Sequence, residues 1–222
     1  MEQINKPKKY LFTELSNPLG KKDNSRAKLL RAGTQLLCEQ SFASMGIERV
    51  IGQAGMTKGS FYHFFKSKEA FALEVIEQYA DFFNQKLDFY LLSSSKPPLD
   101  RLSAYVKDGI KGMERHEFRK GCLIGNMSQE LGATMPLFGA ALEKALTGWQ
   151  IRVADCLNEA IKQEEVSSDI NPDELSAFFW TGWEGALIRS KLVGNAAPIK
   201  NFLANFLKLI SLHNHTKHQG VF

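Results

Sequence analysis

The sequence predicts an all-α chain. Apolar residues recur at helical spacing along most of the 222 residues, and runs of alternating β-branched residues are missing. Clusters of Gly, Pro, Ser and Asn interrupt this periodicity, as expected of loops between helices. Because 44% of the residues are apolar, the chain can bury a sizeable core.

The N-terminal third is expected to hold three helices behind a basic arm. Residues 1–23 are polar and basic and are interpreted as a flexible arm. The first helix is expected after Asn24 and Ser25, which are favourable cap residues. A short helix near 46–54 should end at Gly55-Met56, and Thr57 can cap a third helix from Lys58 to about Phe65.

The rest of the chain is expected to be a larger helical domain. Ser67 should cap a long fourth helix that ends near Leu92, and further helices are expected over residues 98–116, 122–131, 137–164, 172–192 and 198–212. The tail 213–222 contains three histidines but is interpreted as a flexible, solvated terminus, so we expect no metal and no cofactor. The predicted organisation is a basic arm at 1–23, a first domain at 24–70, a second at 71–212 and a tail at 213–222.

Charge is unevenly distributed along the chain. Residues 1–68 contain 12 Lys or Arg and 5 Asp or Glu, a balance of +7, whereas residues 69–222 contain 16 and 19, a balance of −3. A basic N-terminal third favours a nucleic-acid-binding domain. The sequence contains no signal peptide and no apolar stretch of membrane-spanning length, so we expect a cytoplasmic protein. Its three cysteines are widely spaced, so we expect no disulfide framework.

The predicted third helix has two unlike faces. At 100° per residue, Phe61, Phe64 and Phe65 cluster on one side, and Gly59, Tyr62 and His63 lie on the other, with Lys58 and Ser60 on the flanks. The outer face carries no acid, and the helix is entered through a tight Gly turn from another short helix. This pattern predicts a helix-turn-helix with its recognition helix at 58–65. The competing interpretation is a solvent-facing aromatic patch on an ordinary helical bundle.

Residues 29–71 resemble the DNA-binding domain of the TetR family of transcriptional regulators, most specifically in GMTKGSFYHFFKSKEAF at 55–71. The family often has Ser or Thr where this chain has Gly46, and Gly where it has Ser41. The resemblance implies an N-terminal three-helix helix-turn-helix domain and a C-terminal helical dimerisation and ligand domain. It places the DNA contacts on Ser44, Thr57, Lys58, Gly59, Ser60, Tyr62, His63 and Lys68.

Two C-terminal segments are similar to the AcuR-like, acrylate-responsive branch of this family. They are RKGCLIGNMSQELG at 119–132 and FFWTGWEGALIRSKL at 178–192, and the first is also similar to the electrophile-responsive regulator NemR. The resemblance implies a small effector such as acrylate or a related α,β-unsaturated compound.

Cys122 is the candidate effector-contacting thiol. It opens a predicted helix and follows Arg119 and Lys120, and both features favour the reactive thiolate. The alternative is a small buried hydrophobe, which is the interpretation preferred for Cys38 and Cys156. A pocket in the C-terminal half is expected to contain Cys122, Asn126, Trp149, Trp180, Trp183 and Glu184, although tryptophans on helices are often simply core residues.

The last two helices are expected to form a dimer seam. Small residues on the first of these helices permit close helix approach, namely Gly182, Gly185 and Ala186. The last helix has an apolar stripe, formed by Phe202, Leu203, Phe206, Leu207 and Ile210. The predicted function is a homodimeric repressor that binds a palindromic double-stranded operator and is released by a small effector. The protein is expected not to be an enzyme; the alternatives are an all-α enzyme with Cys122 as nucleophile, or a ligand-independent DNA-binding activator.

Overall fold

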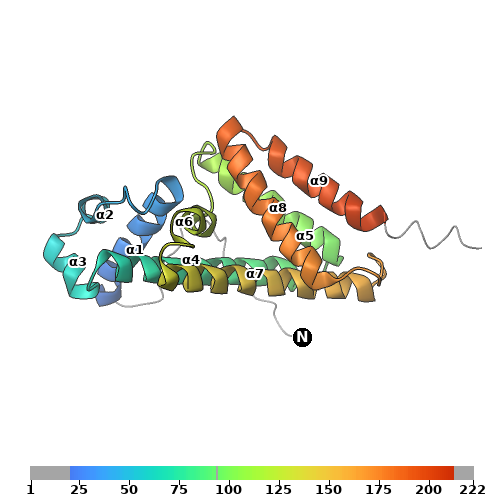
Figure 1. The fold of residues 1–222 in the computed structure, drawn as a ribbon, viewed down its shortest axis with the longest axis horizontal. Helices are drawn as coiled ribbons and strands as arrows, with labels where there is room; N and C mark the ends of the chain where they lie inside the picture. Colours follow the sequence, from blue (N-terminus) through green and yellow to red (C-terminus); the bar gives the residue numbers. More distant parts are fainter. Residues whose placement is uncertain (1–20, 94, 213–222) are drawn as a thin grey trace, which may run out of the picture.

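The computed structural model describes residues 21–93 and 95–212, and the all-α prediction is confirmed for them: they form helices and no strand (Figure 1). The tail at 213–222 and residues 1–20 of the predicted arm lie outside this region. The helices are α1 (Lys21–Glu39), α2 (Ile47–Ala54), α3 (Lys58–Phe64), α4 (Lys68–Leu91), α5 (Pro98–Arg115), α6 (Leu123–Leu131), α7 (Pro136–Lys162), α8 (Pro172–Val193) and α9 (Ala197–Leu212).

Most predicted helix ends fall within two residues of the observed ones, and the start of α1 is the exception. It begins at Lys21, so the prediction that it begins after Asn24 and Ser25 is wrong. Inside a helix, Asn and Ser are less favourable than Ala by only roughly 0.5 kcal/mol, so their presence does not determine where a helix begins. Residues 21–23 of the predicted arm are therefore helical.

Helices α1, α2 and α3 form a cluster at one end of the molecule (Figure 1). Helix α1 packs against both α2 and the beginning of α4. At Gly33 the approach of α4 is so close that a Cβ atom would overlap the ring of Phe71. The glycine in the predicted apolar face of α1 therefore allows α1 to pack closely against α4.

Helix α4 leaves this cluster and extends through the rest of the fold, with α7 alongside it (Figure 1). Its 24 residues correspond to about 36 Å. Helices α5 and α8 complete the core, and all three tryptophans are buried there. No helix in the described part of the chain is long and apolar enough to cross a membrane.

Helices α8 and α9 pack closely within the chain, which changes the predicted seam. Phe206 is only 2% exposed, with its ring 5.2 Å from that of Phe179, and Ile210 is fully buried. A Cβ atom at Gly182 would overlap the ring of Phe202, so this glycine serves the contact between α8 and α9. The prediction that Phe206 and Ile210 form a seam between chains is therefore wrong, because α9 packs both side chains into the core of the same chain.

Candidate DNA-binding element and effector cavity

Helix α3 is defined by caps and by its aromatic core face. Gly55 ends α2 in the left-handed conformation with φ of 65°, which redirects the chain into α3. The Thr57 hydroxyl accepts a hydrogen bond from Ser60 N at 3.2 Å, as predicted for an N-cap. Phe61 and Phe65 are buried, and Phe64 is half-buried against the same core.

The opposite face of α3 is open to solvent. Tyr62 is 48% exposed, and Gly59 and His63 are also exposed. Thr57 and Lys58 at the start of the helix are exposed as well, and Ser60 is half-buried. The structure therefore brings six of the predicted DNA-contacting residues onto one short element.

Lys58 and Glu48 form an exposed ion pair, with Nζ and Oε1 3.4 Å apart, between α3 and α2. Hydrogen bonding to its own backbone N–H, followed by Lys58, lowers the pKa of Glu48. Such exposed pairs contribute little to stability, so Lys58 can exchange this partner for a phosphate.

Ser44 and Lys68 lie beside α3 but already have partners in the protein. Ser44 Oγ donates to the Ser41 carbonyl oxygen at 3.0 Å within the turn that precedes α2. Lys68 Nζ donates to the Phe42 carbonyl oxygen at 2.7 Å and lies 4.2 Å from the centroid of the Phe42 ring. Lys68 therefore ties the start of α4 to this turn.

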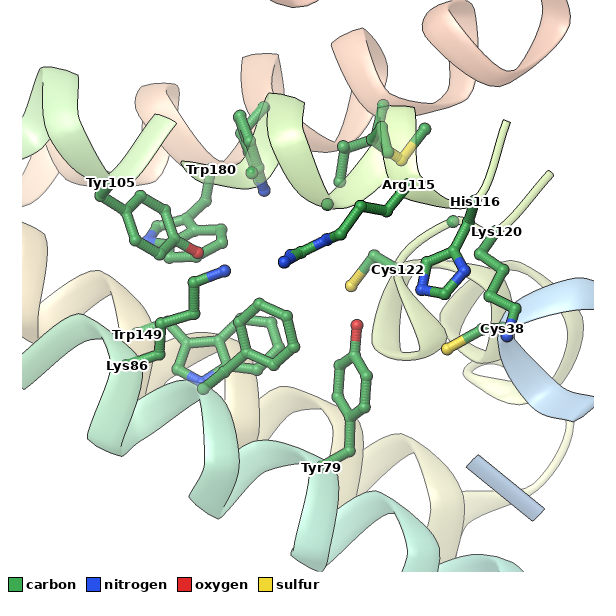
Figure 2. A pocket seen from close by; sticks show the side chains of 17 residues that line it. Cys38, Tyr79, Lys86, Tyr105, Arg115, His116, Lys120, Cys122, Trp149 and Trp180 are labelled. Atoms are coloured by element: carbon green, nitrogen blue, oxygen red, sulfur yellow. The ribbon is translucent and has the colours of Figure 1, made fainter. Parts of the chain in front are cut away.

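A cavity of about 80 Å³ lies between α4, α5, α7 and α8, next to the start of α6 (Figure 2). Six aromatic side chains line it, and two of the cysteines reach it as well. The predicted ligand residues Cys122, Trp149, Trp180 and Trp183 all line it. The remaining aromatic and thiol lining residues are Cys38, Tyr79, Phe83 and Tyr105.

The polar lining of this cavity is cationic. Lys86, Arg115 and Lys120 line it together with His116, and no Asp or Glu is among the lining residues. Lys86 Nζ pairs with Asp108 at 2.6 Å, and Lys120 Nζ pairs with Glu39 at 3.2 Å. Burial, and then the neighbouring Lys120 and Arg115, lower the pKa of His116, so its imidazole is neutral at pH 7.

Cys122 lies at the N-cap of α6, but its surroundings do not favour the thiolate. Burial, and then the Glu184 carboxylate, raise the pKa of the Cys122 thiol well above its ordinary value. Arg119, expected to stabilise the thiolate, is exposed and pairs instead with Glu117, with Nη2 and Oε2 3.3 Å apart. Of the two interpretations of Cys122, these surroundings favour the buried, protonated thiol over the reactive thiolate, because desolvation outweighs the helix N-terminus.

Asn126 and Glu184 lie next to the cavity without lining it. Asn126 Nδ2 donates to the carbonyl oxygens of Leu37 at 3.2 Å and Cys38 at 3.3 Å, which joins α6 to the end of α1. Glu184 is half-buried, but its Oε1 is inaccessible to solvent and the carboxylate accepts from the Cys122 thiol. Burial raises the pKa of Glu184 to about 7.

Several cavity residues were not singled out from the sequence. Lys86 and Tyr105 lie on α4 and α5, far from the Cys122 segment along the chain, and Arg115 lies in the last turn of α5, shortly before that segment. An aromatic and basic pattern on these amphipathic helices is equally typical of core and surface positions. Only the packing of α4 against α5 shows that they share a cavity with Cys122.

The two domains match two family models. Residues 29–75 match the model described as bacterial regulatory proteins, tetR family, and residues 98–206 match the tetracyclin repressor-like C-terminal domain. The transcriptional regulator AcuR of Cereibacter sphaeroides is 42% identical over 85% of this chain and 87% of its own length. The chain belongs to the TetR family. The resemblance of the 55–71 segment is thereby confirmed.

Other TetR-family relatives agree in extent and architecture. The repressor DhaR of a Mycobacterium species is 30% identical over 80% of this chain and 88% of its own length, and the repressor NemR of Escherichia coli is 27% identical over 85% and 94%. A solved regulatory protein TetR from Rhodobacter sphaeroides superposes with a TM-score of 0.81 at 41% identity, covering 83% of this chain and 97% of its own. The reduced form of Escherichia coli NemR superposes with a TM-score of 0.76 at 27% identity, over 82% and 95%.

Proposed function

We propose that this TetR-family regulator is a cytoplasmic repressor that binds a palindromic operator as a homodimer and is released by a small effector. Residues 24–70 would form the DNA-binding domain, and residues 71–212 the sensing and dimerising domain. The observation that carries the proposal is the outer face of α3, which is exposed, contains no acid and projects from a buried aromatic base. A surface of this kind suits the major groove, where hydroxyl, imidazole and ammonium groups reach base edges and phosphates.

The proposed DNA contacts divide into two kinds. Tyr62 and His63 project from the middle of α3 and would contact base edges or phosphates. Gly59 would let the backbone approach the duplex closely. Thr57, Lys58 and Ser60, with Ser44 and Lys68 on the neighbouring elements, would fix the register on the phosphates.

The proposed dimer forms through the outward face of α8. Phe178, Ile188 and Leu192 are exposed at helical spacing on this face, Leu192 at 73%. Gly185 lies between them with open space beside it, so a partner helix can approach closely. Two recognition helices related by such an interface match a palindromic operator.

The proposed effector binds the cavity between α4, α5, α7 and α8. Acrylate or a related α,β-unsaturated compound is the first candidate, because the sequence resembles the acrylate-responsive branch and the cavity lining is aromatic and cationic. A buried, protonated thiol is a poor nucleophile, so we propose reversible binding beside Cys122. The same protonation, together with the regulatory relatives, argues against an enzyme that uses Cys122 as its nucleophile.

The test is a mobility-shift titration on DNA from upstream of the protein's own gene, with and without acrylate, acrolein and saturated acids. Specific binding that acrylate reverses supports a ligand-released repressor. Specific binding that none of these compounds changes would support the ligand-independent alternative. The variant Cys122→Ser separates two mechanisms. Reversible binding predicts that the variant still releases DNA with a shifted dose curve, and that mass spectrometry detects no adduct. Covalent capture predicts an adduct in the wild type alone, and a variant that stays bound to DNA at any effector concentration.

A further inference from the structure

One end of the cavity collects polar groups from α4 and α5. In Figure 2 the Lys86 ammonium, the Tyr105 hydroxyl and the Arg115 guanidinium point toward the same space. Lys86 Nζ lies 5.8 Å from the centroid of the Tyr105 ring, and its side chain is only 13% exposed. The Cys122 thiol and the Tyr79 hydroxyl face this group from the other side.

The Tyr105 hydroxyl is a hydrogen-bonding group without a partner. The residue is 1% exposed, and its Oη forms no hydrogen bond to any other residue of the described chain. A buried hydroxyl without a partner gains a hydrogen bond when a ligand supplies an acceptor. Burial also raises the pKa of Tyr105 well above its ordinary value, so the group remains a hydrogen-bond donor at every physiological pH.

Arg115 supplies the positive charge at this end. Asp108 balances the charge of Lys86. Arg115 extends from the last turn of α5 into the cavity, and it has no ion pair within residues 21–93 and 95–212. An unpaired guanidinium beside an unsatisfied hydroxyl favours an oxyanion, since both groups only donate.

We propose that Arg115, Lys86 and Tyr105 form a carboxylate-binding subsite that selects short-chain monocarboxylates. This inference rests on the proposed effector role of the cavity. The two carboxylate oxygens would accept from the guanidinium, the ammonium and the Tyr105 hydroxyl. The small aromatic space left over would accommodate a tail of a few carbon atoms, directed toward Tyr79 and Cys122.

The subsite is tested by direct binding to the DNA-free full-length protein. Isothermal titration with propionate and its uncharged isostere propionamide separates recognition of the carboxylate from any thiol chemistry, because neither compound is an electrophile. We expect propionate and acrylate to bind, and propionamide to bind at least tenfold more weakly. Equal affinity for the acid and the amide would overturn the proposal, as would the absence of binding by both acids at high millimolar concentration.

Two variants locate the subsite. Tyr105→Phe removes one oxygen and keeps the ring, and Arg115→Gln removes the charge from an exposed residue. Each should weaken acrylate binding fivefold or more, while the circular dichroism spectrum and the melting temperature stay near wild type. The matched control is Arg119→Gln, which alters an exposed arginine of the neighbouring connection outside the cavity and should bind as wild type.

Wild-type affinity in both Tyr105→Phe and Arg115→Gln would overturn the subsite. The operator experiment is read separately. A protein that binds the operator but no carboxylate contradicts the subsite alone, and one that binds carboxylates without releasing DNA contradicts only the effector switch.

Discussion

The carboxylate of Glu130, near the end of α6, accepts hydrogen bonds from the backbone N–H groups of Phe42 at 2.6 Å and Ala43 at 2.7 Å. These two residues belong to the turn between α1 and α2, directly before Ser44. At the other end of α6, Cys122 lines the cavity, and Gly121 N donates to the Cys38 carbonyl oxygen at 3.0 Å. One short helix therefore contacts both the cavity and the DNA-binding domain.

Replacing Glu130 with Ala should uncouple these two regions. Each charge-assisted hydrogen bond contributes about 1.5–3 kcal/mol, so we expect faster amide hydrogen exchange at Phe42 and Ala43 and operator affinity lowered about fivefold or more. The salt dependence of operator binding should remain unchanged, because no phosphate contact is lost. The adjacent exposed residue provides the control, Gln129→Ala, for which exchange and affinity should match wild type. Unaltered exchange at both amides in Glu130→Ala would show that the contact does not hold the turn.

Glu184 should make stability depend on pH. The pKa of this carboxyl rises from an ordinary 4.5 to about 7 on folding, so the folded state holds its proton more tightly than the unfolded state. The contribution of Glu184 to the free energy of unfolding is therefore highest below pH 4.5 and falls as the pH rises toward 7. Glu184→Gln removes the ionisation, so the variant should gain stability relative to wild type, on the order of 1–2 kcal/mol, between pH 5 and pH 8.

Urea denaturation at several pH values measures this difference. Glu114→Gln, which changes an exposed glutamate on α5, should show no such pH-dependent gain. A constant difference in stability between Glu184→Gln and wild type from pH 5 to pH 8 would contradict the raised pKa.

The proposed dimer predicts where a charge separates the subunits. Ile188→Glu combined with Leu192→Glu places two carboxylates on the exposed face of α8, where a partner would bury them at high cost. Light scattering coupled to size-exclusion chromatography should show a folded monomer. Ile151→Glu is the matched control, because Ile151 is an exposed apolar residue on α7 and its variant should remain a dimer. A dimeric double variant would place the interface elsewhere.

Local features of the fold could be predicted from the sequence. Helical periodicity separated the core and outer faces of α3, and short-range capping rules identified Thr57 and Ser67 as N-caps. These features depend on residues within a few positions of one another.

Features that depend on tertiary contacts could not be predicted in the same way. Arg115 and Lys86 reach the cavity because α4 and α5 pack together, whereas Arg119, which is closer to Cys122 in sequence than either, points to solvent. Phe206 has the same helical spacing as an interface residue, and only the fold of α9 over α8 shows that it is internal.

Operator binding by the double variant Tyr62→Ala, His63→Ala tests the central claim most directly. Fluorescence anisotropy with labelled upstream DNA and a scrambled duplex measures specific and non-specific affinity in the same experiment. If α3 reads the operator, each lost contact costs on the order of 1–3 kcal/mol, so the preference for the operator should disappear while helicity and dimer mass stay unchanged. Undiminished preference for the operator in the double variant would contradict the assignment of α3 as the recognition helix.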